Sequence, residues 1–241
     1  MPLFDNILNT SENENSEVKE FNLRDFPINT DDTGKFTNEG ILMGIMNHLH
    51  ITSIGGNLDY SDSLQSTGDS RKNAELIIDF LMRRLGLTRA QAAGIAGVGM
   101  AESGCMPNNY NRAEKAGTYK SSAANGAGYG AGVWQWSNQR KNKALALIGK
   151  PGPIENLSLG EQCEMLAREL EGSYKATLEG IKKCSSAAQS AATFYCHSIA
   201  GYSRSTEPAT QAEIDRDNAR YAKVGGNSQI NKGMKYANGL M

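Results

Sequence analysis

Glu102 is the residue whose type and position best suit acid catalysis. It lies near the end of residues 91–105, QAAGIAGVGMAESGC, whose small residues suit a helix that packs closely against its neighbours. Ile95, Val98 and Glu102 are spaced i, i+3 and i+7, so the carboxylate shares a helix face with apolar residues. Burial and the negative end of the helix dipole both raise a carboxyl pKa, as a glycosidase general acid requires. The alternative is an ordinary exposed glutamate at a frayed helix end.

A second group of candidate residues lies in the glycine-rich run GAGYGAGVWQWS, residues 126–137. Glycines allow backbone to approach a ligand closely, and Trp134 and Trp136 offer flat apolar faces for sugar rings. Gln135 between them offers hydrogen-bond donors and an acceptor. Two alternatives are that at least one tryptophan packs in the core, and that residues 126–131 form a dinucleotide loop of the GxGxxA type. The second lacks the apolar strand that should precede such a loop.

The elements that would hold these residues are helices. Apolar residues recur at helical spacing from Asn73 until Gly86, which suits a C-cap, and residues 184–197 form a further helical candidate. Capping boxes predict three more helix starts, at Thr88 with Gln91, Ser158 with Glu161, and Thr210 with Glu213. No run of alternating apolar residues is long enough for a strand. We therefore expect a mainly α domain at residues 71–225, with an irregular glycine-rich loop at 117–133.

Charge and composition separate the first 70 residues from this domain. Residues 1–70 hold twelve acidic and three basic side chains, whereas the remainder holds fourteen acidic and twenty-two basic ones. A basic body suits an anionic polymer such as cell wall or nucleic acid, unless the acidic segment merely neutralises it. We expect residues 1–70 to be an extended arm and linker, with Ile41–Ile51 as a docking segment or as a helix packed on the domain. Residues 226–241 are expected to be a polar tail.

Other features bear on localisation and cofactors. The N-terminus has no basic region followed by an apolar one, and the longest apolar stretch, 40–54, is too short to span a bilayer. We therefore predict neither a secretion signal nor a membrane span. The four cysteines form no CxxC pair, and His48 and His50 have no third ligand nearby in the sequence, so we expect no metal and no cofactor.

The motifs together carry a resemblance. Glu102-Ser103 followed by GVWQ at residues 132–135 resembles the Glu-Ser and Gly-Leu-Met-Gln motifs of goose-type lysozymes and lytic transglycosylases. The ordered series over about residues 72–224 is more similar to the phage tail lysozyme family. That series comprises Leu87-Thr88, Gln91-Ala92, Gly94, Glu102-Ser103-Gly104, Gln135-Trp136-Ser137, Arg140, Ser158-Leu159, Gln162, Leu166, Glu169, Leu170 and Glu207-Pro208.

The resemblance implies a lysozyme-like fold that cleaves the β-1,4 bond between N-acetylmuramic acid and N-acetylglucosamine. Glu102 would protonate the leaving oxygen, Ser103 would orient Glu102 or the sugar, and Gln135 would bind substrate. A third transglycosylase motif is partly present as AATFYC, where Cys196 replaces the usual asparagine. Its Tyr195 would bind near the substrate and hydrogen-bond Glu102.

A second carboxylate is the remaining requirement for hydrolysis. Between Glu102 and Gly132 the only acidic residue is Glu114, in the stretch where a goose-type enzyme holds its water-activating acid. Arg112 and Lys115 flank it, so Glu114 is either that catalytic acid or a solvated surface ion. If it is not catalytic, Glu102 would act first as acid and then as base, and a muramyl hydroxyl would replace water to give an anhydro product. We expect hydrolysis.

Two other classes of function compete with this interpretation. One is a cysteine peptidase that uses Cys105 and His197, although Cys105 follows a helix and lacks the helix N-terminus that would activate a thiol. The other is a structural virion protein with a degenerate lysozyme fold that only binds wall. We predict instead an enzyme made in the host cytoplasm and carried in the phage tail. Its partners would be peptidoglycan and, through residues 1–70, tail proteins, but not nucleic acid.

Overall fold

The computed structural model describes residues 64–115, 129–150, 152–202, 204–223 and 228–241. By its internal contacts the chain divides into two units, Met1–Gly55 and Gly56–Met241, and the first lies wholly outside the described residues. The predictions for the docking segment Ile41–Ile51, for the His48 and His50 pair, and for most of the glycine-rich loop therefore fall outside the described structure.

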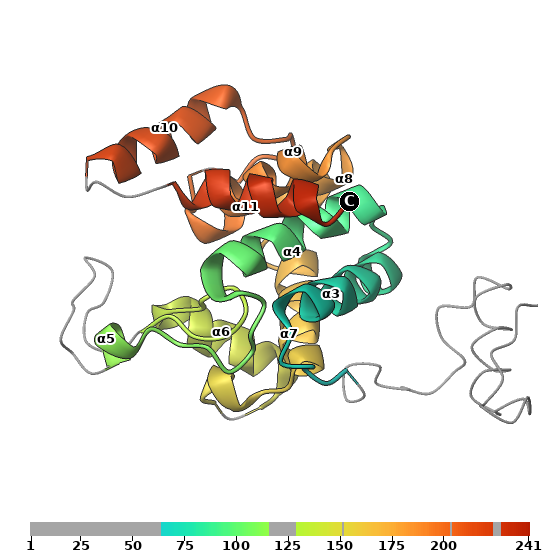
Figure 1. The fold of residues 1–241 in the computed structure, drawn as a ribbon, viewed down its shortest axis with the longest axis vertical. Helices are drawn as coiled ribbons and strands as arrows, with labels where there is room; N and C mark the ends of the chain where they lie inside the picture. Colours follow the sequence, from blue (N-terminus) through green and yellow to red (C-terminus); the bar gives the residue numbers. More distant parts are fainter. Residues whose placement is uncertain (1–63, 116–128, 151, 203, 224–227) are drawn as a thin grey trace, which may run out of the picture. The chain divides into compact units, whose positions relative to one another are not determined.

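The described part of the second unit is built from helices (Figure 1). Two isolated bridges, Tyr110 with Ala131 and Ala131 with Trp136, are the only β pairings in the described ranges. The mainly α fold class is thus confirmed. In chain order the elements are α3 (Ser70–Leu85), α4 (Arg89–Ser103), α5 (Arg112–Lys115), α6 (Asn138–Ile148), η2 (Ile154–Asn156), α7 (Leu159–Glu171), α8 (Lys175–Lys182), α9 (Ala187–Phe194), the π-helical turn η3 (Tyr195–Ile199), α10 (Gln211–Ala222) and α11 (Gln229–Gly239).

The helix boundaries follow the local signals in the sequence. The three predicted capping boxes are present at the starts of α4, α7 and α10, where each cap side chain and the third helical residue exchange hydrogen bonds. Helix α3 begins at Ser70, slightly before the predicted Asn73, because Asp69 accepts a hydrogen bond from the Lys72 amide as its N-cap. Gly86 ends α3 in the left-handed conformation, with φ 65°.

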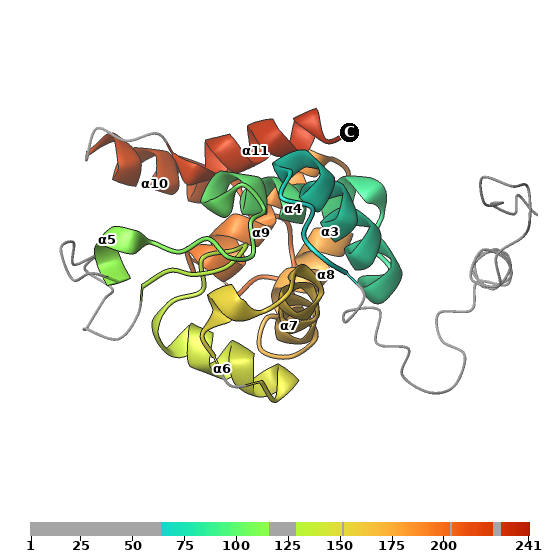
Figure 2. The same ribbon diagram turned by 60° about the horizontal axis from the view of Figure 1, so that its bottom comes forward.

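Helix α4 occupies the centre of the domain and packs against α3, α9 and α11 (Figure 2). Its glycines lie where neighbouring chains come closest. A Cβ atom at Gly94 would be 2.4 Å from the Ser190 Cβ of α9, and one at Gly97 would be 2.6 Å from the backbone of Gly233 and Ala237 in α11. The small residues of α4 therefore allow two helices to pack directly on its backbone, as the sequence predicted.

Two of the expected segment boundaries are wrong. The predicted polar tail, 226–241, contains α11, in which Ile230 and Ala237 are buried against the core. The predicted linker up to residue 70 also ends too late. Leu64 is buried, and its carbonyl accepts a hydrogen bond from the Gly160 amide at 3.0 Å. The folded domain thus includes residues on both sides of the predicted limits.

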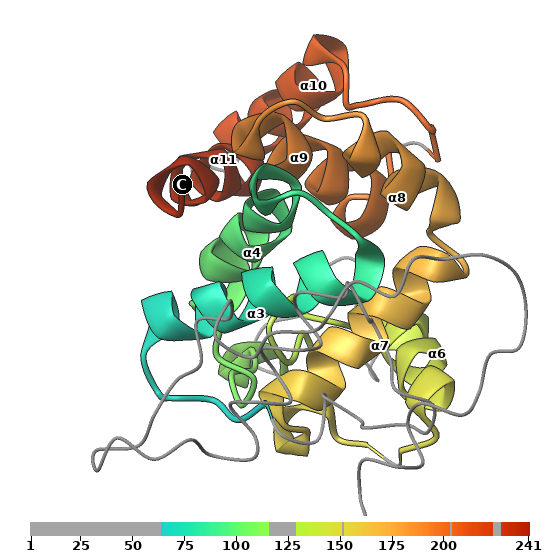
Figure 3. The same cartoon turned by 90° about the vertical axis from the view of Figure 1, so that its right-hand side faces the viewer.

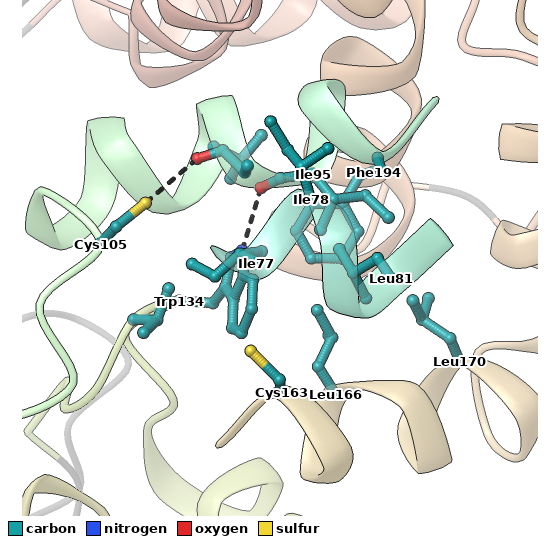
Figure 4. Packing of buried hydrophobic residues seen from close by; sticks show 14 of the residues in the cluster. Ile77, Ile78, Leu81, Ile95, Cys105, Trp134, Cys163, Leu166, Leu170 and Phe194 are labelled. Atoms are coloured by element: carbon teal, nitrogen blue, oxygen red, sulfur yellow. Dashed lines mark hydrogen bonds between the residues drawn. The ribbon is translucent and has the colours of Figure 1, made fainter. Parts of the chain in front are cut away.

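Helices α6 and α7 pack on one another, and α7 also contacts α3 and α8 (Figure 3). The core between these helices and α4 contains Trp134 from the loop before α6, with Ile77, Ile95, Leu166 and Phe194 around it (Figure 4). The loop is therefore anchored in the core by its own aromatic residue. Among the described helices, none has the length and apolar character needed to cross a membrane.

Candidate active site

Glu102 lies in the last turn of α4. The helix ends at Gly104, which has φ 71° and whose amide donates to the Met100 carbonyl at 3.1 Å. Within the described ranges, no side chain or amide donates a hydrogen bond to the Glu102 carboxylate. The side chain is half-buried, so a ligand can reach the carboxyl while protein atoms replace much of its water.

Burial is the main influence on this carboxyl. Desolvation raises the pKa of Glu102 to about 7. The positive charges of Lys232 on α11 and Arg140 on α6 oppose this change, whereas the negative charge of Asp217 on α10 adds to it. The predicted environment of Glu102, an acid that keeps its proton near neutral pH, is thus present. Burial produces it with help from the charge of Asp217, against the opposing charges of Lys232 and Arg140.

Tyr195 lies near Glu102 but does not hydrogen-bond to it. Desolvation chiefly raises the pKa of the Tyr195 phenol, and the charge of Glu102 raises it further. The phenol is 4% exposed and pairs with the hydroxyl of Tyr221 on α10 at 3.3 Å. The expected hydrogen bond to Glu102 is therefore absent in this structure, and the Tyr195 phenol is paired with Tyr221 instead.

Ser103 fixes the loop that follows α4 rather than facing a sugar. Its hydroxyl is buried and lies 2.8 Å from the Val133 carbonyl and 3.2 Å from the Gly99 carbonyl. Its own carbonyl accepts a hydrogen bond from the Asn109 side chain at 3.1 Å. The predicted contact of Ser103 with Glu102 or with a sugar is thus not seen, because the hydroxyl is used by backbone carbonyls. The residue joins the end of the Glu102 helix to the loop at 132–135.

Trp134 and Trp136 are core residues, and the prediction that they stack on sugar rings is wrong. Both are fully buried, and their rings meet edge to face with centroids 5.4 Å apart. The Trp134 indole donates to the Ile95 carbonyl at 3.1 Å, and the Trp136 indole donates to a Glu169 oxygen at 2.7 Å. Each ring is therefore oriented by its N–H group and presents no face to a ligand.

Gln135, between the two buried tryptophans, stays partly exposed. It adopts the left-handed backbone conformation, with φ 50°, which is unusual for a residue other than glycine. Its side-chain amide donates to the Gly132 carbonyl at 3.0 Å. Gly130 leaves room for it, because a Cβ there would lie 2.8 Å from the Gln135 side-chain oxygen. Strain of this kind is often retained where it aims a side chain at a ligand.

The remaining motif residues hold the loop in place from behind. Arg140 forms two hydrogen bonds of 3.0 Å with the buried carboxylate of Glu169, which also receives the Trp136 indole. Gln162 on α7 accepts from the Val133 amide at 2.9 Å and donates to the Pro107 carbonyl at 2.8 Å. These contacts join α6 and α7 to the loop that follows α4 and to the loop that precedes α6. The motif residues are therefore spaced along the chain as the elements that they connect.

Comparison with known protein families assigns the chain to one of them. Residues 72–223, more than half of the chain, match the family model described as phage tail lysozyme. The chain belongs to the phage tail lysozyme family. Membership supports a lysozyme-like peptidoglycan hydrolase. Searches of curated proteins and of solved structures gave no match.

Three residues of this candidate site were missed by the sequence analysis, and all lie on α10 or α11. Asp217 is fully buried and accepts hydrogen bonds from the Tyr202 hydroxyl at 2.9 Å and the Ser228 hydroxyl at 2.8 Å. Tyr221 pairs with Tyr195, and Lys232 acts on Glu102. Asp217 stands in the highly charged stretch EIDRDNAR, which is typical of a solvated helix face. Lys232 lies beyond the family match, so neither had a signal apart from its helical spacing.

The other predicted candidates have separate outcomes. The side chain of Glu114 lies outside the described structure, although its backbone belongs to α5. Cys105 and His197 are not brought together, because the Cys105 thiol contacts the Ala96 carbonyl at 3.5 Å and His197 faces Glu213 at 3.4 Å. Burial also raises the pKa of the Cys105 thiol far above its ordinary value. The cysteine peptidase alternative is therefore wrong.

Proposed function

We propose that this protein cleaves the β-1,4 bond between N-acetylmuramic acid and N-acetylglucosamine, with Glu102 as the general acid. The observation that carries the proposal is the state of the Glu102 carboxyl. It is half-buried, receives no hydrogen bond from the described residues, and has its pKa raised to about 7 by desolvation. Such a carboxyl holds a proton near neutral pH and leaves that proton free for a ligand.

The surroundings of Glu102 suit both halves of the proton transfer. The protonated carboxyl donates to the glycosidic oxygen while the bond from that oxygen to the sugar carbon breaks. The carboxylate that remains is negatively charged, and the positive charges of Lys232 and Arg140 stabilise it. Gln135, on its strained backbone, is the proposed substrate-binding side chain.

The second step requires a nucleophile. Asp217, the only other acid that acts on Glu102 within the described residues, is buried and accepts hydrogen bonds with both oxygens, so it cannot activate a water molecule directly. We propose that Glu114, whose sequence position suits this role, activates water and makes the enzyme a hydrolase. If Glu114 has no such role, a muramyl hydroxyl would attack instead and give anhydro ends.

Glu102→Gln is the central test. The amide has nearly the same shape but cannot donate the proton, and general acid catalysis typically contributes about 10²–10⁴-fold to the rate. Wild-type and mutant protein would be incubated with purified peptidoglycan, and the released fragments identified by mass spectrometry. We expect disaccharide-containing fragments from the wild type and none above background from the mutant.

Circular dichroism would serve as the control that Glu102→Gln is folded. Appreciable cleavage by the folded mutant would assign the acid to another residue. A wild type that binds wall but releases no fragments would favour the alternative of a structural virion protein with a degenerate lysozyme fold.

We also propose that the enzyme is a phage tail component that reaches the host wall as part of the virion, with residues 1–70 contacting the tail.

A further inference from the structure

Helix α11 packs on α4, the helix that carries the proposed acid, and it is held there by direct backbone contact. A Cβ atom at Gly233 would lie 3.2 Å from the Val98 side chain, and one at Gly97 would lie 2.6 Å from the Gly233 carbonyl. Lys232 directly precedes Gly233 in the same helix. The backbone at Lys232 is therefore held against the C-terminal half of α4, in which Glu102 lies.

The first turn of α11 is also anchored from the other side. Ser228 is the N-cap of the helix, and its hydroxyl donates to the buried Asp217 carboxylate at 2.8 Å. Ile230 is fully buried in the core. The backbone that carries Lys232 is thus held by a cap, a buried apolar side chain and the contact between Gly97 and Gly233, so its ammonium group has a limited range.

The two cations that act on Glu102 differ in their partners. Arg140 is committed to Glu169 by two hydrogen bonds of 3.0 Å. Lys232 is half-buried, and its side chain forms neither a salt bridge nor a hydrogen bond with the residues that the structure describes. A cation beside a general acid favours the deprotonated form of that acid, so in the free enzyme Lys232 works against the proton that catalysis needs.

We propose that Lys232 binds a carboxylate of the wall polymer next to the bond that is cleaved. This inference rests on the proposed function, because it assigns a substrate group to the same site. The polymer offers two sources of this group: the peptide stems, and the lactyl group of muramic acid where the stem has been removed. The ammonium group of a half-buried lysine with no ion-pair partner among the described residues suits either source, because charge-assisted hydrogen bonds strengthen as water is excluded.

Binding of this carboxylate would also act on Glu102. Charged or titratable groups face Glu102 from four elements: Lys232 on α11, Arg140 on α6, Asp217 on α10 and Tyr195 on η3. A substrate carboxylate on Lys232 would cancel one of the two positive charges that lower the pKa of Glu102. The substrate would therefore help the acid to retain its proton in the complex.

The test combines changes in the enzyme with changes in the substrate. Soluble glycan strands would be used with their carboxylates intact, with all carboxylates converted to amides, or with the stems removed to leave lactyl carboxylates. Each would be assayed with wild type, Lys232→Met, Lys232→Arg and Lys235→Met. Lys235 is the matched control, because it lies on the same helix and is exposed.

We expect Lys232→Met to lower kcat/KM on intact strands by about tenfold, mostly through KM, and amidation of the strands to cost the wild type the same factor. Amidation should then have no further effect on Lys232→Met. Lys232→Arg should retain most of the activity, and Lys235→Met should match the wild type. The lactyl carboxyl of an intact strand is in amide linkage to the stem, so a dependence on Lys232 that intact strands show and stripped strands lose would identify the stem carboxylates as the partner. A dependence that only stripped strands show would identify the lactyl carboxylate, and one that both show would mean that Lys232 accepts either group.

The pH profile adds a readout that a merely structural role would not change. The fall of kcat/KM at high pH reports the pKa of Glu102 in the free enzyme, and the fall of kcat reports its pKa in the substrate complex. In the wild type, kcat should fall at a higher pH than kcat/KM, whereas in Lys232→Met both should fall at the same pH. If amidation of the strands lowered kcat/KM by the same factor in the wild type and in Lys232→Met, the proposal would be overturned. If Lys232→Met did not fold, Lys232→Gln would replace it. Failure of the wild type to cleave any strand would instead refute the proposed function.

Discussion

The pKa values of two partly buried carboxyls, those of Glu102 and Glu155, change in opposite directions. Desolvation acts to raise the pKa of Glu155, but hydrogen bonds from Tyr129, from its own backbone amide and from Lys115 outweigh it, so that pKa is lowered. The Tyr129 hydroxyl donates to Glu155 at 2.7 Å and Lys115 pairs with it at 3.0 Å. Glu102 has burial without such donors among the described residues, and this difference accounts for its raised pKa.

This difference predicts how stability should depend on pH. Burial raises the pKa of Glu102 from 4.5 to about 7, so between these values the folded state holds a proton that the unfolded state has released. The contribution of this proton to the free energy of unfolding is therefore complete below about pH 4.5 and is lost as the pH rises through about 7. Glu102→Gln does not titrate. It should match the wild type in acid and exceed its free energy of unfolding by about 3 kcal/mol at high pH, at 1.36 kcal/mol per pKa unit. Urea denaturation at pH 4 and pH 8 measures this, and an equal difference at both values would contradict it.

Glu114→Gln separates the two possible second steps. If Glu114 activates water, the wild type should release reducing sugars, and the mutant should be slower because an amide cannot act as the base. If a muramyl hydroxyl attacks instead, anhydromuramyl ends should appear and the mutant should retain nearly normal rates. Mass spectrometry of the products distinguishes these ends, and we expect the reducing ones. Anhydro ends as the main product of the wild type would refute our choice of hydrolysis.

At individual residues, local spacing predicted the place of Glu102. It lies on a partly buried face in the last turn of α4, as expected, and its catalytic role stays a prediction. The roles of Trp134 and Trp136 were not predicted, because their indole groups are satisfied by Ile95 and Glu169, which lie 39 and 33 residues away along the chain. A tryptophan buried in the core and one exposed to a sugar have the same local sequence pattern, and only such distant partners separate them.

Among the elements, α4 determines how the others are arranged. Its small residues predicted close packing, and α9 and α11 both pack against it. The capping boxes predicted the starts of α4, α7 and α10, because the signal and the structure it forms lie within four residues. Helix α11 was mistaken for a tail because it contacts α4 through Gly233 and Ala237, and small residues give only a weak hydrophobic pattern.

Gly97→Ala tests the contact between α4 and α11. Helix propensity alone predicts that alanine would stabilise an exposed helix by about 1 kcal/mol. Here the added methyl would lie 2.6 Å from backbone atoms of Gly233 and Ala237, which cannot rotate away as a flexible side chain would. We expect the free energy of unfolding to fall by about 1–3 kcal/mol, measured by urea denaturation.

Gly239→Ala is the control for that measurement. Gly239 lies in α11, and an added Cβ there would meet nothing within 4 Å. This variant should be as stable as the wild type or slightly more stable. If Gly97→Ala behaved in the same way, α11 would not be packed on α4 as described, and the position inferred for Lys232 would lose its support.

At the scale of the whole molecule, the boundary between the two units and the boundary of the family match do not coincide. The compact second unit begins at Gly56, the described structure at Leu64 and the match at residue 72. Leu64 and the helix cap Asp69 precede the match but belong to the folded domain. At the other end, α11 follows the match and completes the core around α4. The unit that folds is therefore longer than the region that defines the family.

Deletion of residues 1–63 tests whether the N-terminal region serves the enzyme or its attachment. The candidate active-site residues all follow Leu64, so the truncated protein should stay soluble and cleave soluble glycan strands at the wild-type rate. Deletion of residues 1–70 should be less stable, because it also removes the buried Leu64 and the Asp69 cap, which alone contributes about 1 kcal/mol. Both should fail to co-sediment with tail particles that retain the full-length protein. If the protein lacking residues 1–63 were insoluble or inactive, the segment at 37–54 would be packed on the catalytic domain as part of its core, and the docking role would have to be abandoned.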